Sequence, residues 1–209
     1  MTTLVLATTS AGKLREIRAE LADTGFDPIL TLKELPSVSL FPEDGRTFEE
    51  NAIGKALYYS RATPHLTVAD DSGLEVQYLE GGPGVYSARF GGEHVSYDEK
   101  NRMILHLLEG VQDKARTARF RCVLAVAQRE SVLAVFHGTV EGLIAHEAAG
   151  NGGFGYDPIF YVPSLGKTLA QVPLETKNTL SHRGNAARKL RRYLLENRDR
   201  LAAAPESSP

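Results

Sequence analysis

The sequence contains almost no cysteine and no hydrophobic run long enough to cross a membrane. Its 209 residues include a single cysteine, Cys122, so no disulfide can form within the chain. Cys122 lies in the apolar run 119–126, which predicts a buried strand and favours a structural thiol over a nucleophile. No apolar run approaches the roughly 20 residues that a membrane span needs, so no membrane partner is expected.

Neither sign of charge is in large excess. The formal net charge of −2 provides no global field for nucleic acid, so local cations must meet any anionic ligand. The basic cluster of Arg188, Lys189, Arg191 and Arg192 lacks interleaved aromatic residues and is typical of a solvated helix face. We therefore expect no nucleic-acid partner. The N-terminal residues carry neither a basic region nor a long apolar core, which predicts a cytoplasmic protein.

The length and composition are those of an ordinary globular protein. A chain of 209 residues with 42% hydrophobic and 24% charged residues fits one sizeable domain or two tightly joined lobes. Such a fold buries about 70% of the surface of the unfolded chain. No internal repeat or linker is evident. We therefore predict one domain over residues 1–201 and a frayed, disordered tail over 202–209.

The hydrophobic patterning predicts an α/β fold. A short apolar strand at 4–7 precedes Ser10, which can cap a helix whose apolar residues recur at helical spacing until Gly25. A capping box from Thr47 to Glu50 begins a second helix. Further helices are predicted at 96–110 and 181–201, and strands at 66–69, 74–78, 118–128 and 132–144. This number of strands exceeds that of a regular βαβ array, which favours a mixed sheet with helices packed around it.

The loop after the first strand is suited to bind phosphates. It contains Thr8, Thr9, Ser10, Ala11, Gly12 and Lys13. Because the loop opens a helix, its backbone N–H groups, the helix dipole and the lysine ammonium can all face an anion. The loop is not a Walker A motif, since the first glycine is missing and Leu14 follows the lysine. An ordinary polar turn explains the same residues when they are taken alone.

Carboxylates at two places are suited to hold a divalent cation. Asp70 and Asp71 follow a predicted strand, and adjacent residues of an extended backbone point to opposite sides, so one of them is expected to face a site. Strand ends present catalytic groups, and Mg²⁺ prefers a few carboxylate oxygens together with substrate phosphates. Glu43 lies in Pro-Glu-Asp-Gly, which is also a good turn sequence. Hydrogen bonding within turns is the alternative for all three residues.

Two further patterns have both a structural and a functional interpretation. Thr47, Asn51 and Lys55 lie one turn apart on a polar helix face, which an ordinary solvated face explains equally. The segment 150–155 matches G-x-G-x-x-G formally, but Pro158 argues against a helix there and we reject a dinucleotide site. His146 lacks the second histidine of a zinc motif, so no zinc is implied.

The segments Gly153–Pro158 and Ser181–Gly184 combine flexible backbone, an aromatic face and fixed hydrogen-bond donors. This combination is suited to bind a flat, polar ring. Together with the phosphate loop and the carboxylates, it predicts a nucleotide ligand.

Taken in order, these segments resemble the inosine triphosphate pyrophosphatase family over roughly residues 3–195. Enzymes of this family hydrolyse non-standard purine nucleoside triphosphates such as ITP, dITP and XTP. The matching blocks are Leu6–Lys13, Thr47-Phe48 with Glu50–Ala52 and Lys55-Ala56, Ala69–Leu74, Pro83–Phe90, Gly152–Pro158 and Ser181–Gly184. The chain differs at Ser10, where the family usually has asparagine, and a serine hydroxyl cannot offer the two donors of an amide.

The resemblance implies an elongated mixed sheet with two lobes around a central nucleotide cleft, dependence on Mg²⁺, and a homodimer. The expected products are the nucleoside monophosphate and pyrophosphate, formed by attack of water without a covalent intermediate. The resemblance assigns the metal to Glu43 and Asp71, and the role of general base to Asp71. It places the substrate phosphates on Thr8, Thr9, Ser10, Ala11, Gly12 and Lys13, with Lys55 as a further cation. Ser72 is expected to touch the substrate, and the base and sugar are assigned to Phe154, Gly155, Tyr156, Asp157, Lys177, His182 and Arg183.

Two other functions are compatible with the sequence. One is a nucleotide-binding regulator that uses the same cleft without turnover. The other is a pyrophosphatase on the same scaffold that acts on other modified nucleotides, including modified pyrimidines. Carboxylates at both Glu43 and Asp71 argue against the regulator, because binding a polyanion gains nothing from unneutralised negative charge.

Overall fold

The computed structural model describes residues 2–35 and 38–202. Its strands are β1 (Thr2–Ala7), β2 (Phe26–Thr31), β3 (Leu66–Val76), β4 (Thr117–Gln128), β5 (Ser131–Ile144), β6 (Phe160–Val162) and β7 (Lys167–Thr168). Its α-helices are α1 (Ala11–Leu21), α2 (Phe48–Ser60), α3 (Tyr97–Leu107), α4 (Leu174–Leu180), α5 (His182–Glu196) and α6 (Arg198–Ala202). Short 3₁₀ turns connect several of these elements.

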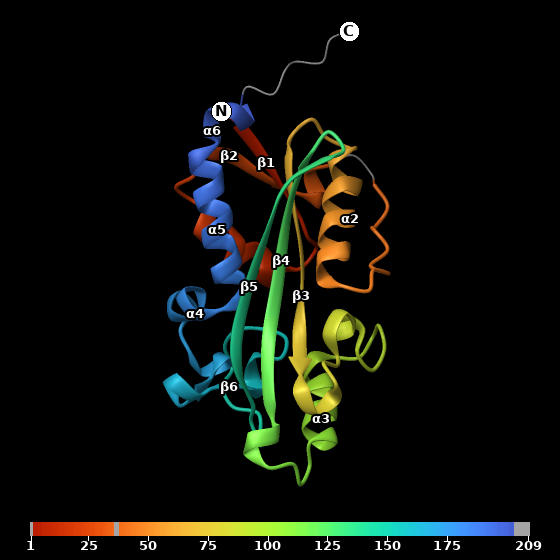
Figure 1. Cartoon of the computed structure of the whole chain (residues 1–209), viewed down its shortest axis with the longest axis vertical. Coiled ribbons are helices and arrows are strands. Elements are labelled where there is room, and N and C mark those ends of the chain that lie inside the picture. Colours follow the sequence, from red (N-terminus) through yellow and green to blue (C-terminus); the bar gives the residue numbers. More distant parts are fainter. Residues whose placement is uncertain (1, 36–37, 203–209) are drawn as a thin grey trace. The chain divides into compact units, whose positions relative to one another are not determined.

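The strands form one mixed sheet in the order β2-β1-β3-β4-β5-β6-β7. β1 pairs in parallel with β2 and β3, whereas β6 pairs antiparallel with β5 and β7. β4 and β5 form a long hairpin (Figure 1) that turns at Arg129 and Glu130, both of which have positive φ, at 49° and 65°. Two such residues in succession give the turn that best matches the twist of paired strands. The predicted α/β fold with a mixed sheet and flanking helices is confirmed.

The chain divides into two compact units, each assembled from separate stretches of sequence. Unit 1 comprises Met1–Asp71, Val123–His137 and Ala186–Pro209, and unit 2 comprises Ser72–Cys122 and Gly138–Asn185. The chain passes between the units within β3, β4, β5 and α5. As a consequence, the two aspartates of β3 belong to unit 1 and the adjacent Ser72 belongs to unit 2.

The core of unit 1 forms around β1, whose residues Leu4–Ala7 are all buried. A continuous buried run is expected of a strand with both faces covered. Two helices begin where the sequence predicts: the Ser10 side chain accepts from the Lys13 N–H at 3.5 Å, and the Thr47 side chain accepts from the Glu50 N–H at 3.1 Å. The capping box predicted at Thr47 is only half formed, because the Glu50 carboxylate accepts from the Arg46 N–H instead.

Unit 2 has its own hydrophobic core beneath α3. The buried cluster includes Leu74, Ile104, Phe120, Tyr156 and Phe160. Cys122 is buried in β4, as the apolar run around it predicts.

The structure differs from the sequence-based prediction at several places. The strands β2, β6 and β7 were not predicted, and the helix predicted at 181–201 is divided into α5 and α6. β3 does not end at the aspartates but continues through them to Val76, beyond Ala69, the last residue that pairs with β1. The helix α4 was not predicted. The predicted tail begins one residue too early, since Ala202 belongs to α6, and residues 203–209 lie outside the described part of the chain.

Among residues 2–35 and 38–202, none of the helices has the length and apolar character required to span a membrane.

Candidate active site

In unit 1, Asn51 and Lys55 on the polar face of α2 are buried, so the interpretation of these two residues as part of a solvated helix face is wrong, whereas Thr47 is exposed. Asn51 and Lys55 are 1% and 7% exposed. They lie four residues apart, so both point from the same side of the helix. The Lys55 ammonium donates to the Asp70 backbone oxygen at 2.9 Å and forms an ion pair with Glu43. A buried lysine that faces carboxylates supplies fixed positive charge for an anionic ligand.

The Asp71 carboxylate is buried among these groups. Its Oδ2 accepts a hydrogen bond from Asn51 Nδ2 at 2.9 Å. Burial raises the pKa of Asp71 above its ordinary value, and repulsion from Glu43 adds to this effect. Attraction to Lys13 and Lys55 and the Asn51 hydrogen bond lower the same pKa, but burial dominates. The structure therefore brings together the predicted base, the predicted metal ligand Glu43 and both predicted phosphate-binding lysines.

Asp70 has a different role from its neighbour. It is 1% exposed, and its Oδ2 forms an ion pair with Lys13 Nζ at 2.8 Å. The two aspartates thus have different partners, as alternation along a strand predicts. Asp70 fixes the position of the lysine ammonium at the start of α1.

The predicted phosphate loop leads from β1 into α1. Thr8 is buried, and its hydroxyl accepts from the Ser10 N–H at 3.3 Å. Thr9 and Ala11 are exposed, whereas Ser10, Gly12 and Lys13 are half-buried. The backbone of the first turn of α1 therefore borders solvent, where an anion can approach the N-terminus of the helix.

The carboxylates present suit Mg²⁺ better than a metal held by protein ligands alone. Within the described part of the chain, no group of three or more histidine, cysteine, aspartate or glutamate residues could hold a metal ion. Glu43 and Asp71 could supply oxygen ligands, and Lys55 links the two regions because its ammonium pairs with Glu43 and donates to the backbone oxygen of Asp70. Mg²⁺ is usually held by one or two carboxylates together with waters and substrate phosphates. The donor set therefore fits Mg²⁺ bound with a nucleotide.

In unit 2, a buried ion pair organises the second group of predicted residues. Asp157 and Lys177 are 2% and 1% exposed, and they pair with each other. The same Asp157 oxygen accepts from the Phe154 N–H at 2.7 Å. Gly153 has a φ of +70°, and a Cβ there would lie 2.1 Å from that oxygen. The loop can therefore close around Asp157 only with glycine at position 153.

Two cations lie against the ring of Phe154. Lys177 Nζ is 4.6 Å from the ring centroid, and Arg183 Cζ is 5.3 Å from it. Both distances are within the range of cation–π attraction. Arg183 is 2% exposed, and it also donates to the Ser72 hydroxyl at 2.8 Å. These contacts join Ser72, Phe154, Lys177 and Arg183 in one cluster.

Two other predicted base-binding residues are tied to the core of unit 2. The His182 ring stacks on Phe120 with a centroid distance of 4.7 Å and an interplanar angle of 12°. Tyr156 is 3% exposed and its hydroxyl donates to the Ser87 backbone oxygen at 2.8 Å. Burial raises the pKa of Tyr156 far above its ordinary value. Of the two aromatic residues predicted beside the base, half-buried Phe154 is the more accessible.

The structure adds residues whose contacts the sequence does not predict. Asn51 holds Asp71, Asp70 holds Lys13, and Asn101 Nδ2 donates to the Gly155 backbone oxygen at 3.2 Å. For the contact between Asn51 and Asp71, the only signal in the sequence was that Asn51 lies one helical turn before Lys55. No sequence signal indicated Phe120 beneath His182.

The basic cluster of α5 contacts acidic side chains of unit 1. Arg188 lies 3.7 Å from Glu20, and Arg191 lies 3.9 Å from Asp23. Both arginine side chains are 39% exposed, so these two residues are only partly solvated.

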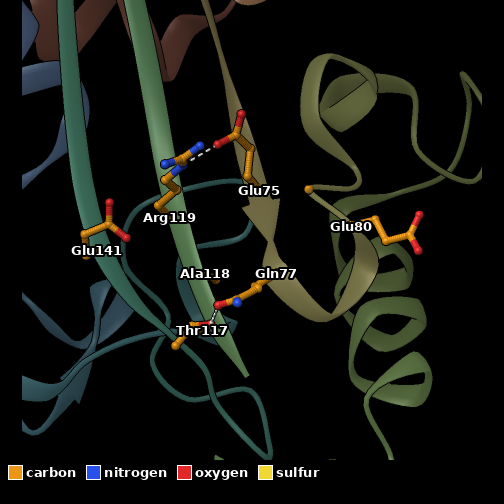
Figure 2. A pocket seen from close by; sticks show the side chains of 8 residues that line it. Glu75, Gln77, Glu80, Thr117, Ala118, Arg119 and Glu141 are labelled. Atoms are coloured by element: carbon orange, nitrogen blue, oxygen red, sulfur yellow. Dashed lines mark hydrogen bonds and ion pairs between the residues drawn. The ribbon is translucent and has the colours of Figure 1, made fainter. Parts of the chain in front are cut away.

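Unit 2 also contains a cavity of about 560 Å³ that involves none of the predicted site residues (Figure 2). Arg119 forms an ion pair with Glu75, Gln77 contacts the Thr117 hydroxyl, and the Glu80 side chain turns away from both pairs (Figure 2). The lining is Glu75, Gln77, Glu80, Gly81, Thr117, Ala118, Arg119 and Glu141. Three glutamates against one arginine disfavour a triphosphate here.

Comparisons with known proteins identify the family of the chain. A model of the Ham1 family matches residues 4–193. The chain is 48% identical to a dITP/XTP pyrophosphatase of Desulforamulus reducens, over 89% of this chain and 92% of that protein. It is 46% identical to a dITP/XTP pyrophosphatase of Geobacter sulfurreducens, over 93% of this chain and 97% of that protein. The solved structure of a HAM1 protein from Coxiella burnetii is similar with a TM-score of 0.84 and 40% identity, covering 94% of this chain and all of that one.

Proposed function

Since the chain belongs to the Ham1 family, we propose that it is a nucleoside-triphosphate pyrophosphatase acting on dITP, XTP and ITP. Hydrolysis gives the nucleoside monophosphate and pyrophosphate and removes non-standard purines from the nucleotide pool. Relatives named dITP/XTP pyrophosphatase, at 42–48% identity over most of the chain, support the substrate class. The observation that carries the proposal is the buried Asp71 carboxylate, with Lys13, Lys55 and Glu43 within electrostatic range.

The chemistry follows from the charges of unit 1. Phosphoryl transfer requires mainly positioning and charge stabilisation. In this mechanism Asp71 orients the attacking water and accepts its proton. The ammonium groups of Lys13 and Lys55 stabilise the negative charge that develops on the phosphates. Their fixed positions, set by contacts with Asp70, avoid reorganisation during the reaction.

We propose Mg²⁺ as the cofactor, held by Glu43 and Asp71. A bound Mg²⁺ neutralises phosphate oxygens and orients the triphosphate chain. The contribution of this chain is a pair of carboxylate oxygens of which one, on Asp71, is already fixed by Asn51.

We propose that the cluster in unit 2 reads the base. Lys177 and Arg183 are cations beside the Phe154 ring, and His182 lies next to Arg183 in the sequence. Their donors suit the 6-oxo acceptor that hypoxanthine and xanthine share. Adenine has an amino donor at the same position, so donors would face each other unpaired.

We also propose that the protein is a homodimer in the cytoplasm. In unit 2, Tyr78 and Tyr86 are 54% and 59% exposed, and Arg89 lies 4.9 Å from the centroid of the Tyr86 ring. Exposed tyrosine and arginine are enriched at protein interfaces, which supports association.

A panel of ITP, dITP, XTP, ATP, UTP and dTTP separates the proposed function from its alternatives. We expect Mg²⁺-dependent turnover of the first three and slow turnover of the others. Fast hydrolysis of UTP or dTTP would favour a pyrophosphatase for other modified nucleotides. Tight binding of ITP without turnover of any member would indicate a nucleotide-binding regulator.

A further inference from the structure

We propose that Asn51 is a positioning residue that holds the Asp71 carboxylate and the Glu43 loop in one fixed arrangement. This inference rests on the proposed function. Both ends of the side-chain amide are used: Nδ2 donates to Asp71 Oδ2 at 2.9 Å, and Oδ1 accepts from the Gly45 N–H at 2.8 Å. One buried side chain on α2 therefore joins β3 to the loop that contains Glu43.

Burial makes these hydrogen bonds decisive for geometry. Asn51 is 1% exposed and Asp71 is 5% exposed. In such a place water cannot readily replace a lost partner, so the amide constrains the orientation of the carboxylate. Gly45 lies two residues after Glu43, and its bond to Asn51 limits the movement of that loop relative to Asp71.

The neighbouring contacts show that the loop is built to fit this amide. A Cβ at Gly45 would lie 2.5 Å from Asn51 Oδ1, closer than a side chain tolerates. Lys55, one turn after Asn51, pairs with Glu43 and donates to the Asp70 backbone oxygen. α2 thus holds Glu43 through Lys55, and it holds Asp71 and Gly45 through Asn51.

Replacement of Asn51 is expected to affect the binding of Mg²⁺ more than the binding of nucleotide without metal. Residues that orient metal ligands typically change metal affinity or activity by about 10–100-fold when they are replaced. The phosphate loop and the base-reading cluster do not contact Asn51 through any hydrogen bond described above. Loss of Asn51 is therefore expected to weaken the contribution of Mg²⁺ while metal-independent nucleotide binding is retained.

The test compares Asn51→Leu with Ser60→Ala as a matched control. Leucine keeps the branched shape of asparagine, with the same number of heavy atoms, but has no polar atoms. Ser60 is also buried on α2, where its hydroxyl bonds the Leu57 oxygen at 2.9 Å and accepts from the Glu130 N–H at 3.3 Å. The control therefore removes buried hydrogen bonds from the same helix without touching the Asp71 region.

Binding of a non-hydrolysable α,β-methylene analogue of ITP is measured by calorimetry with and without Mg²⁺, and kcat is measured with ITP. We expect Asn51→Leu to bind the analogue like the parent without Mg²⁺, and to lose about 10–100-fold in kcat and in the Mg²⁺-dependent gain of affinity. Ser60→Ala should retain the parental kcat and the parental Mg²⁺-dependent gain of affinity. The inference would be wrong if Asn51→Leu had the same kcat and the same Mg²⁺-dependent gain of affinity as Ser60→Ala. It would also be wrong if Asn51→Leu lost as much affinity for the analogue without Mg²⁺ as with it.

A second variant covers the case in which Asn51→Leu does not fold. Gly45→Ala leaves the amide in the sequence but displaces it, so the same loss of the Mg²⁺-dependent gain is expected. A folded Gly45→Ala protein with the parental gain would overturn the inference. Failure of the proposed function has a different signature, because the parent itself would then release no pyrophosphate from ITP.

Discussion

Replacement of Asp71 by asparagine is expected to abolish most turnover while the fold and much of the nucleotide affinity remain. The change conserves volume, and an asparagine Oδ1 can still accept from Asn51 Nδ2, which now bonds Asp71 at 2.9 Å. In the proposed mechanism it removes the negative charge that would hold the metal and accept a proton from water. General-base catalysis alone contributes about 10²–10⁴-fold, so a loss of at least this size is expected in single-turnover rate with ITP.

Asp70→Asn is the matched control for this change. Asp70 is equally buried and adjacent in the sequence, but its carboxylate contacts Lys13 at 2.8 Å. We expect a smaller loss, expressed mainly as weaker binding of the triphosphate. Comparable single-turnover rates for Asp71→Asn and the parent would remove Asp71 from the catalytic role.

The second large effect is expected in base selectivity. Arg183→Ala and His182→Ala should reduce the ratio of kcat/KM for ITP to kcat/KM for ATP, chiefly by lowering kcat/KM for ITP. Each buried group left without a partner costs about 1–3 kcal/mol, and a site built on a required hydrogen bond rejects the mismatched analogue by up to about 10⁴–10⁵. Arg183 is suited to this role because it is fixed by Ser72 and Phe154 and is 2% exposed.

Arg188→Ala provides the control on the same helix, since Arg188 lies on the basic face of α5 and reaches Glu20 only at 3.7 Å. It should leave the ITP-to-ATP ratio unchanged. If both Arg183→Ala and His182→Ala also kept the parental ratio, base recognition would have to reside elsewhere in the chain.

Local signals predicted the fold where a single side chain or a long pattern decides it. Ser10 and Thr47 cap their helices as expected, and the two apolar runs after residue 117 form the β4–β5 hairpin. The continuation of β3 through Asp70 and Asp71 was not predictable from these residues, because aspartate and glycine are poor strand formers. The tertiary structure overrides that preference, since β3 continues to Val76 as a strand of the sheet.

In the candidate site, too, some features could be predicted from local sequence and others depend on tertiary contacts. The order of motifs predicted which residues form the site, and the structure supplies the contacts that these residues make. Whether the polar face of α2 is solvated depends on what packs against it, and the sequence of α2 contains no information about that. Only the tertiary contacts reveal that Asn51 and Lys55 are buried against Asp71 and Glu43. Similarly, nothing local distinguishes Tyr156, which bonds Ser87 in the core, from half-buried Phe154.

The most direct test of the account is the identity of the first products formed from ITP. ³¹P NMR of ITP with purified protein and Mg²⁺ observes all phosphate species at once, without a coupled enzyme. Cleavage between the α and β phosphates predicts that IMP and pyrophosphate appear together in equal amounts. The appearance of IDP and orthophosphate as the first products would contradict the account.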